Sequence, residues 1–572
     1  MSECQTNRLV KYYLQRTVER ANRASQPGML DPEYARSGFA NPRYQEACLT
    51  LSLAAHHKCC IPDGMTPEQL ESIAISALDT WLRLQHRTGA VRTQQSGVLD
   101  TQATAYGLFA LAHTLLLLKD KIPAPIENRA QKGLRKAARY LSSAPVPPGL
   151  ETRPIRSAAL MAAAAWLDNS SILASARTIR QEGIKQLRDS LNNPEKYTLD
   201  AGALSLTLAF LVLGDDSRDE ETKSLFDMLV QRCLLSTTPG GLYGGGAESS
   251  LACLPILTGF CATSSWLKTS ATVATLLKHA YEEQLYNALL DPDVPYLAPM
   301  SYLTLYAHLL EPTEGILPTI QEPEFQILST GCGRLHVEDW NLRLGMGGTI
   351  GWMHHHPTDS TRLFGSPTGL ALREGPWLIE GNRLRHPSFA GKFNIIDSAP
   401  WTIEGELYSL PIPGTERSPR RVGFPRLGGR QSGTGTRLVP PPKQVSYRTS
   451  APVKYRREIE MKDGALTIET QVNGKVLHRL PMIWPGGMYG EILVDKNRRL
   501  LSHVLEERRV REISFKGGYW PTWTVRFDRP VDLLYEPIHG LITSSPMRYL
   551  SAAGGTFDIL ATDRLHMAWR VG

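Results

Sequence analysis

Six apolar segments of helical length, repeated about every 50 residues, constrain the first half of this chain more than any other feature. They begin near Pro42, Asp100, Pro154, Asp200, Ala247 and Ala298. Each is apolar on nearly all sides, so other helices have to cover it. More polar segments with apolar residues at helical spacing, such as Thr66–His86, lie between them. Residues 1–315 are therefore predicted to form an (α/α) toroid, with an inner ring of helices wrapped by an outer ring.

Beyond Glu311 the apolar pattern changes to a period of two residues. Leu466, Ile468, Thr470 and Val472 alternate with more polar neighbours, and glycine and proline punctuate the sequence heavily. Residues 316–572 are predicted to form a large antiparallel β-sandwich, so the fold class is α+β in two domains. The boundary is expected in the proline-rich stretch 312–323.

Composition limits the functional class. The chain has 572 residues, of which 42% are hydrophobic and 21% charged, as in globular proteins. No apolar run reaches the roughly 18 residues of a membrane span, so no membrane partner is expected. The first residues are polar, and the eight cysteines include the adjacent pair Cys59–Cys60 but no C-x-x-C. These features predict reduced thiols in a cytoplasmic protein, or a secreted one if a leader was removed.

The net charge of +7 is concentrated between Arg417 and Arg457, where cations far outnumber acids. Two interpretations stay open: a solvated loop, or an electrostatic collar that attracts a polyanion. The sequence contains no zinc finger, aromatic ribonucleoprotein motif or basic helix, so a nucleic-acid partner is not expected.

Candidate functional residues lie in the loops that lead into the inner helices, because helix N-termini favour anions. We expect these loops to contribute substrate-binding residues. They are Arg92, Arg153, Arg156, Tyr243 and Glu248. The arginines are expected to bind carboxylates, and Tyr243, in a glycine-rich loop, to stack on a sugar. Glu248 is alternatively an acid that only stabilises a helix start.

Tyrosines and arginines are plentiful in these loops relative to paired acids. A glycosidase of the usual kind needs two carboxylic acids beside the scissile bond. A uronate lyase must instead neutralise the sugar carboxylate, remove the adjacent proton and protonate the leaving oxygen. Arginine can do the first, and tyrosine and histidine the other two.

Two motifs carry a resemblance to a known family. The segments "APMSYLTLYAHLL" (298–310) and "MHHHPTDSTRLFGSPTGLALREGPWLIEGN" (353–382) resemble segments of the heparinase II/III-like and alginate-lyase-like polysaccharide lyases. The resemblance implies that Tyr302 is a catalytic acid or base, with His356 or His355 as its partner across the two domains. It implies an anionic, uronate-containing poly- or oligosaccharide as substrate and β-elimination as the reaction. No cofactor is required for this chemistry.

Other hypotheses remain. The histidine run with Asp359 also allows a zinc site, because His354 and His356 are expected on one face of a strand. An α/α-barrel glycoside hydrolase would use Asp100, Asp200 or Glu248. A non-catalytic polyanion-binding protein would use the basic segment alone. Tyr106, His113 and Tyr306 are predicted to be core residues.

Overall fold

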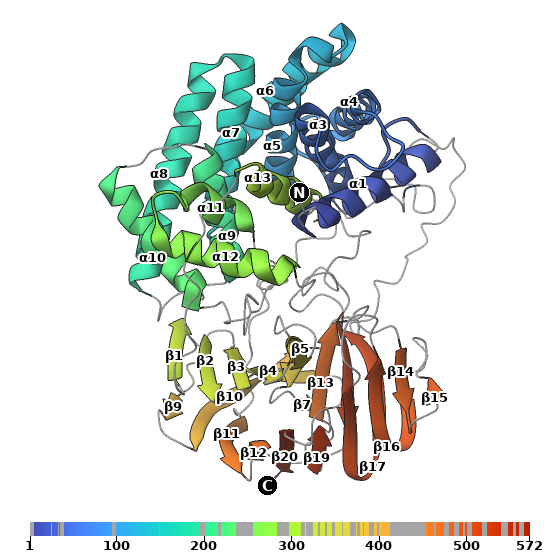
Figure 1. Ribbon diagram of the computed structural model, residues 1–572, viewed down its shortest axis with the longest axis vertical. Helices are drawn as coiled ribbons and strands as arrows, with labels where there is room; N and C mark the ends of the chain where they lie inside the picture. The colour runs from blue at the N-terminus through green and yellow to red at the C-terminus, as the bar shows by residue number, and fades with distance from the viewer. Residues whose placement is uncertain are drawn as a thin grey trace, which may run out of the picture. The chain divides into compact units, whose positions relative to one another are not determined.

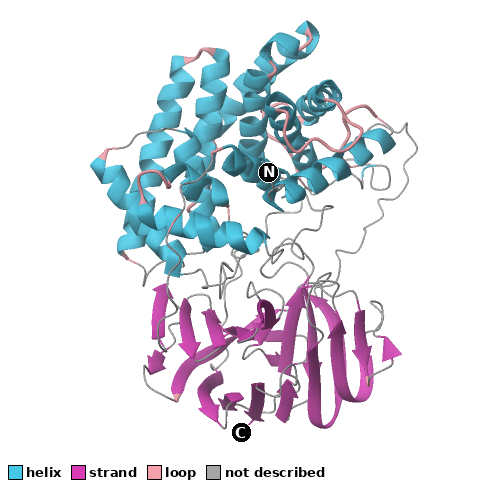
Figure 2. Ribbon diagram, viewed as in Figure 1, coloured by secondary structure: helices cyan, strands magenta, loops and turns pink. Residues whose placement is uncertain are grey.

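The computed structural model describes a helical part and a strand part (Figures 1 and 2). The described residues run from 5 to 310, except 25, 32–33, 35–38, 94–98, 148, 194–200, 215–218, 236–255 and 283–296. They continue with residue 315 and with the strands and adjoining turns between 324 and 571. The chain divides into two compact units, a helical unit (1–194, 201–243 and 254–320) and a strand unit (195–200, 244–253 and 321–572).

The apolar helices of the helical unit follow one another in a closed series. They are α3 (Ala47–His57), α5 (Thr101–Leu117), α7 (Thr152–Leu167), α9 (Ala201–Gly214), α11 (Leu257–Thr263) and α13 (Leu297–Leu309). Each contacts the next, and α13 returns to contact α3. Their side chains are buried on nearly all sides, as Leu108, Phe109 and Phe210 illustrate with exposures of 0%.

More polar helices form a second closed series around the first (Figure 1). They are α1 (Gln5–Arg23), α4 (Pro67–Leu84), α6 (Ala124–Ser143), α8 (Ser170–Asn192), α10 (Glu220–Leu235) and α12 (Lys268–Glu282). Each contacts the next, and α12 contacts α1. In α4 the buried residues Leu70, Ala74, Leu78 and Trp81 recur at helical spacing, so one stripe faces the inner helices.

Local signals set the ends of these helices. A capping box between Thr66 and Gln69 starts α4, and the Asn169 side chain accepts a hydrogen bond from Ile172 N at the start of α8. The first apolar segment was predicted to begin near Pro42. Residues Pro42–Glu46 instead form a 3₁₀ helix, η1, and the α-helix follows it; a second 3₁₀ turn, η2, spans Lys119–Lys121.

The strand unit pairs in two runs. The first follows the order β1 (Glu324–Ser329), β2 (Cys332–Val337), β3 (Trp340–Gly345), β4 (Thr349–His356), β6 (Arg373–Glu374), β13 (Leu480–Pro485), β18 (Met547–Ala552), β17 (Trp523–Ile538), β16 (Glu506–Lys516), β14 (Glu491–Val494) and β15 (Arg498–Arg499). Strand β5 (Asp359–Gly365) also pairs with β4.

The second run follows the order β7 (Leu378–Glu380), β8 (Arg383–Pro387), β10 (Trp401–Pro411), β11 (Val453–Lys462), β12 (Ala465–Asn473), β20 (Leu565–Val571), β19 (Thr556–Ile559) and β17. Strand β9 (Asn394–Ile396) pairs with β10. The two runs meet at β17, which pairs with β19 through Val525–Phe527 and with β18 through Leu533–Ile538. The pairs are antiparallel except β12 with β20, which is parallel.

Cross-strand register places apolar side chains on one buried face. Ile459 of β11 lies opposite Ile468 of β12, and both are at most 1% exposed. The prediction of a helix-rich first part followed by antiparallel strands is confirmed. Among the residues that the structure describes, no helix has both the length and the apolarity needed to cross a membrane.

Candidate functional site

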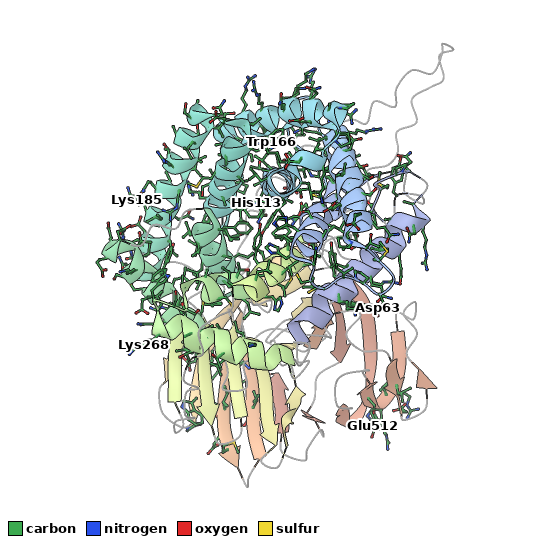
Figure 3. The ribbon with its side chains drawn as sticks, turned by 45° about the horizontal axis from the view of Figure 1, so that its top comes forward. Asp63, His113, Trp166, Lys185, Lys268 and Glu512 are labelled. Atoms are coloured by element: carbon green, nitrogen blue, oxygen red, sulfur yellow. The ribbon has the colours of Figure 1, made fainter. Side chains whose placement is uncertain are left out.

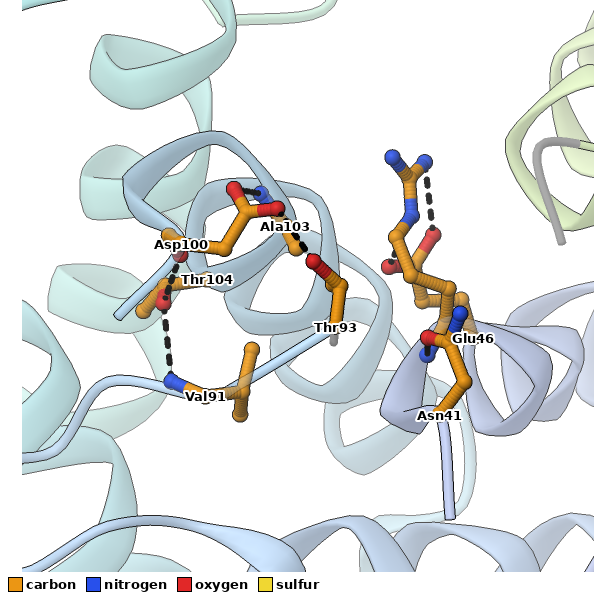
Figure 4. Close-up of polar contacts among 8 residues, drawn as sticks. Asn41, Glu46, Val91, Thr93, Asp100, Ala103 and Thr104 are labelled. Carbon is orange, nitrogen blue, oxygen red and sulfur yellow. Dashed lines mark hydrogen bonds and ion pairs between the residues drawn. The ribbon is translucent and has the colours of Figure 1, made fainter. Parts of the chain in front are cut away.

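A buried ion pair lies at the start of the first inner helix. Arg43 and Glu46 are three residues apart, so the turn of η1 brings their side chains together. Arg43 Nε lies 3.0 Å from Glu46 Oε1, and Nη2 lies 3.3 Å from Oε2. Asn41 holds the turn in place by accepting a hydrogen bond from the Arg43 amide (Figure 4). The carboxylate of Glu46 is completely buried.

Two tyrosines from other inner helices surround this pair. The Arg43 guanidinium carbon lies 4.5 Å from the ring centroid of Tyr106 on α5, a cation–π contact. The hydroxyl of Tyr302 on α13 is buried and has no hydrogen-bond partner among the described residues. Burial raises the pKa of Tyr302 well above its ordinary value of 10; the Glu46 and Tyr106 charges add to this, and Arg43 opposes it.

Glu46 is set up to hold a proton. Burial raises the pKa of its carboxyl from 4.5 to about 8, although the neighbouring Arg43 acts in the opposite direction. The carboxyl is therefore mostly protonated near neutral pH. It can act as an acid in that form, and as the counter-ion of Arg43 when it is ionised.

Asp100 is the N-cap of α5, and both of its carboxylate oxygens are occupied (Figure 4). Oδ1 accepts a hydrogen bond from Ala103 N at 2.8 Å, and Oδ2 accepts one from Thr93 Oγ1 at 2.8 Å. Its backbone carbonyl accepts a further hydrogen bond from Thr104 Oγ1. These contacts give Asp100 a structural role and leave its carboxylate poorly placed to shuttle a proton.

A phenol and an imidazole meet inside the helical unit. Tyr306 Oη of α13 and His113 Nδ1 of α5 are 3.3 Å apart, and the His113 tautomer decides which group donates. The centroids of the His113 and Phe109 rings lie 4.3 Å apart. Figure 3 labels His113 among the helices. Both residues are half-buried, unlike Tyr302.

Burial sets the protonation of this pair. It lowers the pKa of His113 to about 4, so the imidazole is neutral at pH 7, and it raises the pKa of Tyr306, so the phenol is protonated. A neutral imidazole and a protonated phenol in hydrogen-bond reach are the groups that general acid–base catalysis uses. The contact is also compatible with the expectation that His113 and Tyr306 are core residues whose polar atoms satisfy each other, and that expectation stays a prediction.

The predicted arginines have different surroundings. Arg92 is exposed. Arg153 forms an ion pair with Glu182 (Nε to Oε2, 3.3 Å) and donates a hydrogen bond to Gln186, both on α8. Arg156 is 3% exposed and donates a hydrogen bond to the Ala144 carbonyl at 2.9 Å. Both arginines therefore take part in helix packing, and their role in substrate binding stays a prediction.

Several predicted residues lie outside the described part of the chain. These are Tyr243, Glu248 and Asp200, together with the side chains of His354, His355, His356 and Asp359. The backbone pairs His354 with Phe364, His355 with Leu363 and His356 with Asp359. The register shift between His355 and His356 arises in β5, whose partner residue passes from Leu363 to Asp359, so the shared face of His354 and His356 stays a prediction. Among the described residues, no group of three or more His, Cys, Asp or Glu is arranged to hold a metal ion.

Two arginines at the end of the basic segment offer no free positive charge to a ligand. Arg456 of β11 forms ion pairs with Glu404 (3.3 Å) and Glu458 (2.8 Å). The neighbouring Arg457 is completely buried. Lys454 of β11 is exposed, and residues 412–452, which hold the other cations of the segment, lie outside the described residues.

The Arg43–Glu46 pair was not predicted from the sequence, and His113 and Tyr306 were predicted to be core residues. A signal for the first exists in "PRYQEACLTLSLAAHH", where opposite charges three residues apart open an otherwise apolar helix. The second pair has no local signal, because its members are 193 residues apart.

Comparison with known proteins gives a structural likeness. No family model and no curated protein matches the chain. Among solved structures, a Paenibacillus xanthan lyase aligns over 98% of this chain at 12% identity, with a TM-score of 0.41. The chain spans 56% of the length of that lyase. The chondroitin AC lyase of Streptomyces coelicolor A3, in complex with chondroitin sulphate, aligns over 96% of this chain and 76% of its own length, at 10% identity and a TM-score of 0.46.

Heparan sulfate lyase HepC from Pedobacter heparinus aligns over 96% of this chain and 86% of its own length, at 10% identity and a TM-score of 0.30. These structural neighbours are all polysaccharide lyases. With TM-scores below 0.5, the function of this chain has to be inferred from its own residues.

Proposed function

We propose that this chain is a carbon–oxygen lyase that cleaves an anionic poly- or oligosaccharide by β-elimination. The observation that carries the proposal is the 3.3 Å contact between Tyr306 Oη and His113 Nδ1, in a half-buried setting that keeps the imidazole neutral. In this assignment His113 accepts the proton beside the sugar carboxylate, and Tyr306 protonates the leaving glycosidic oxygen.

Tyr306 is preferred to Tyr302 as the catalytic phenol. Tyr302 is 0% exposed, so a polymer cannot touch its hydroxyl without displacing other side chains. Tyr306 follows it by one helical turn and is half-buried. Tyr302 then has a positioning role, one helical turn before Tyr306 and in ring contact with Phe109.

Binding of the substrate carboxylate is assigned to exposed cations, with Arg92 first among the described residues. Stacking by Tyr243 and a contribution from His355 or His356 remain part of the proposal, and mutagenesis can test each.

We also infer that the closed series of helices is an (α/α) toroid over residues 1–315, and that the two strand runs joined by β17 form a β-sandwich over 316–572. The helix packing and the strand pairing support both inferences.

One observation favours a second function. Because the pKa of Glu46 is raised to about 8, this carboxyl is a proton donor at neutral pH, as the acid of a glycoside hydrolase has to be. The complete burial of Glu46 and its ion pair with Arg43 weigh against this role. The occupied oxygens of Asp100 weigh against its service as the second carboxylate.

A panel of uronate-containing polymers separates the two functions. β-Elimination leaves a conjugated double bond that absorbs in the ultraviolet, whereas hydrolysis releases reducing ends without that signal. We expect the ultraviolet signal, and a loss of about 10²-fold or more in kcat for Tyr306→Phe and for His113→Gln. Tyr12→Phe, on the exposed surface of α1, is the matched control and is expected to keep full activity.

Two results would contradict the assignment. Reducing ends without ultraviolet absorbance would favour the hydrolase. An ultraviolet signal that Tyr302→Phe abolishes and Tyr306→Phe preserves would return the catalytic role to Tyr302.

A further inference from the structure

The adjacent cysteines Cys59 and Cys60 lie directly after the first inner helix. Helix α3 ends at His57, and Lys58 takes a left-handed conformation with φ of 52°. The amides of Lys58 and Cys59 then donate hydrogen bonds to the carbonyls of Ala55 (3.3 Å) and Ala54 (3.1 Å), which closes the helix end. Cys59 is therefore attached to a fixed structural element through its own backbone.

Local backbone strain and exposure distinguish this pair. Cys60 has φ of 55°, a conformation that costs a residue with a Cβ roughly 1 kcal/mol. Both thiols are reduced and half-buried, whereas Cys48, Cys233 and Cys261 are reduced and buried. Reagents in solution can therefore reach Cys59 and Cys60 before these three.

The two thiols also interact. A hydrogen bond from the Cys60 side chain lowers the pKa of the Cys59 thiol, and partial burial opposes this effect. By contrast, burial raises the pKa of Cys48 and of Cys261 to about 12.

We propose that Cys59 and Cys60 are a redox-active vicinal dithiol that exchanges with low-molecular-weight disulfides of the glutathione type. The Cys59 thiolate attacks one sulfur of the small disulfide and forms a mixed disulfide, releasing one small thiolate, which takes up a proton. The Cys60 thiol, after losing its proton, attacks Cys59 sulfur and releases the second small thiol. Two protein thiols are oxidised to one disulfide, and one small disulfide is reduced to two thiols.

The product would be easily reduced again. Cα atoms joined by a trans peptide are about 3.8 Å apart. Most disulfides join Cα atoms about 4.4 to 6.8 Å apart, and departures from that range store strain. Strained disulfides have more oxidising potentials and serve as labile bonds rather than permanent ones. Ring closure between neighbours would also pull on the Cys59 amide that closes α3.

The alternative function for the sequence "HHKCC" is metal binding. The described residues around the pair contain no group of three or more His, Cys, Asp or Glu arranged to bind an ion. The His56 and His57 rings lie 4.9 Å apart, edge to face, in contact with each other. Exchange chemistry needs only the two thiols.

Peptide mapping of the full-length protein tests the proposal. The reduced chain is incubated with oxidised glutathione, unreacted thiols are blocked with iodoacetamide, and the peptide containing Cys59 and Cys60 is analysed by mass spectrometry. We expect an intramolecular disulfide in the wild type, which dithiothreitol reverses. In Cys60→Ser we expect a glutathione adduct that persists on Cys59. In Cys59→Ser we expect a Cys60 that iodoacetamide alkylates in full.

Other outcomes would overturn the proposal. It fails if both thiols of the wild type carry iodoacetamide after oxidation, or if each carries its own glutathione. It also fails if Cys59→Ser forms an adduct on Cys60 as readily as Cys60→Ser does on Cys59. Cys48 and Cys261 serve as internal controls in every sample, since burial should keep them free of glutathione. The wild-type result stands independently of the variants and of the proposed lyase activity.

Discussion

At the scale of single residues, the pKa of the Glu46 carboxyl lies far above that of a carboxyl in water. Water cannot solvate the charge of a fully buried carboxylate. A bound proton removes that charge, and a neighbouring cation offsets it. Glu46 has both, because burial raises its pKa to about 8 and Arg43 lies 3.0 Å away. Its protonation therefore links folding to pH.

Stability should decrease as pH rises through the interval between the unfolded and folded pKa values of Glu46. Between 4.5 and about 8 the unfolded chain releases the proton while the folded chain keeps it. The contribution of this group to the free energy of unfolding then falls by about 1 kcal/mol per pH unit. Glu46→Gln should remove that contribution, as urea unfolding across this range would show.

Glu71→Gln is the control for this pH dependence. Glu71 lies in the outer helix α4 and forms an ion pair with Lys121 at 2.5 Å, with 11% of its side chain exposed. Comparison of the two variants separates the loss of the Glu46 proton from the loss of an ion pair at another glutamate. The same pH dependence in Glu46→Gln as in the wild type would show that Glu46 does not hold the proton.

At the scale of secondary-structure elements, α5 carries much of the candidate site. Asp100 caps its start, Tyr106 lies under Arg43, and His113 meets Tyr306 near its other end. The helix sits close to α4 because Gly107 leaves room for the fully buried Trp81. The cap and the glycine therefore help to fix the positions of Tyr106 and His113 along α5.

Asp100 variants separate capping from catalysis. Asp100→Ala should lower stability by about 1 kcal/mol, because the Ala103 amide loses its acceptor. Asp100→Asn keeps a side-chain oxygen for that amide and should retain both stability and lyase activity. Urea unfolding and the ultraviolet assay measure the two properties. A stable Asp100→Asn protein without activity would show that the carboxylate is catalytic, as in the hydrolase alternative.

Gly107→Ala should destabilise the protein although alanine favours helices. The added Cβ would overlap the Trp81 indole at Nε1, so the indole or the helix must move, at a cost of about 2 kcal/mol. Gly214→Ala, whose Cβ would meet Ala158 at an ordinary 3.4 Å, is the control and should be close to neutral. Thermal unfolding of the two variants compares them; equal melting temperatures would mean that α4 and α5 are not packed this tightly.

At the scale of the helical unit as a whole, closure of the inner series joins distant parts of the chain. Thr50 of α3 and Ser301 of α13 are 251 residues apart, yet their hydroxyl oxygens lie 2.7 Å from each other in the interior. Ser301 also donates to the Ala298 carbonyl, so Thr50 is the donor in the shared hydrogen bond. Folding therefore has to bring the first and last inner helices together before this contact forms.

Thr50→Val and Ser301→Ala should each cost about 1 kcal/mol, because each removes one partner of a buried hydrogen bond. The double variant should cost less than the sum of the two, since the bond can be lost only once. Urea unfolding of the four proteins gives the coupling free energy. Strict additivity would argue against contact between α3 and α13.

Much of the fold follows from local pattern. The apolar segments predicted near Asp100, Pro154 and Asp200 correspond to α5, α7 and α9, because each is a long run of apolar residues with good helix propensity, and Asp100 also caps the start of α5. The first outer helix, α1, was not predicted, because its sequence is polar and its burial depends on contacts with α12 and α13.

The sequence alone determined the alternation of apolar and amphipathic helices, their caps, and the change to strands, because these signals act within one or two turns of the chain. It also assembled the Arg43–Glu46 pair, whose members share one turn. Only the tertiary structure decided that Arg43 meets Tyr106, that His113 meets Tyr306, and that Tyr302 is buried while Tyr306 is half-buried. The physical reason is that hydrophobic burial is non-directional, so an apolar pattern states that a helix is covered but not by which partner. Proton affinity depends on that partner and on the depth of burial, so the chemistry of the site is settled only after the helices pack.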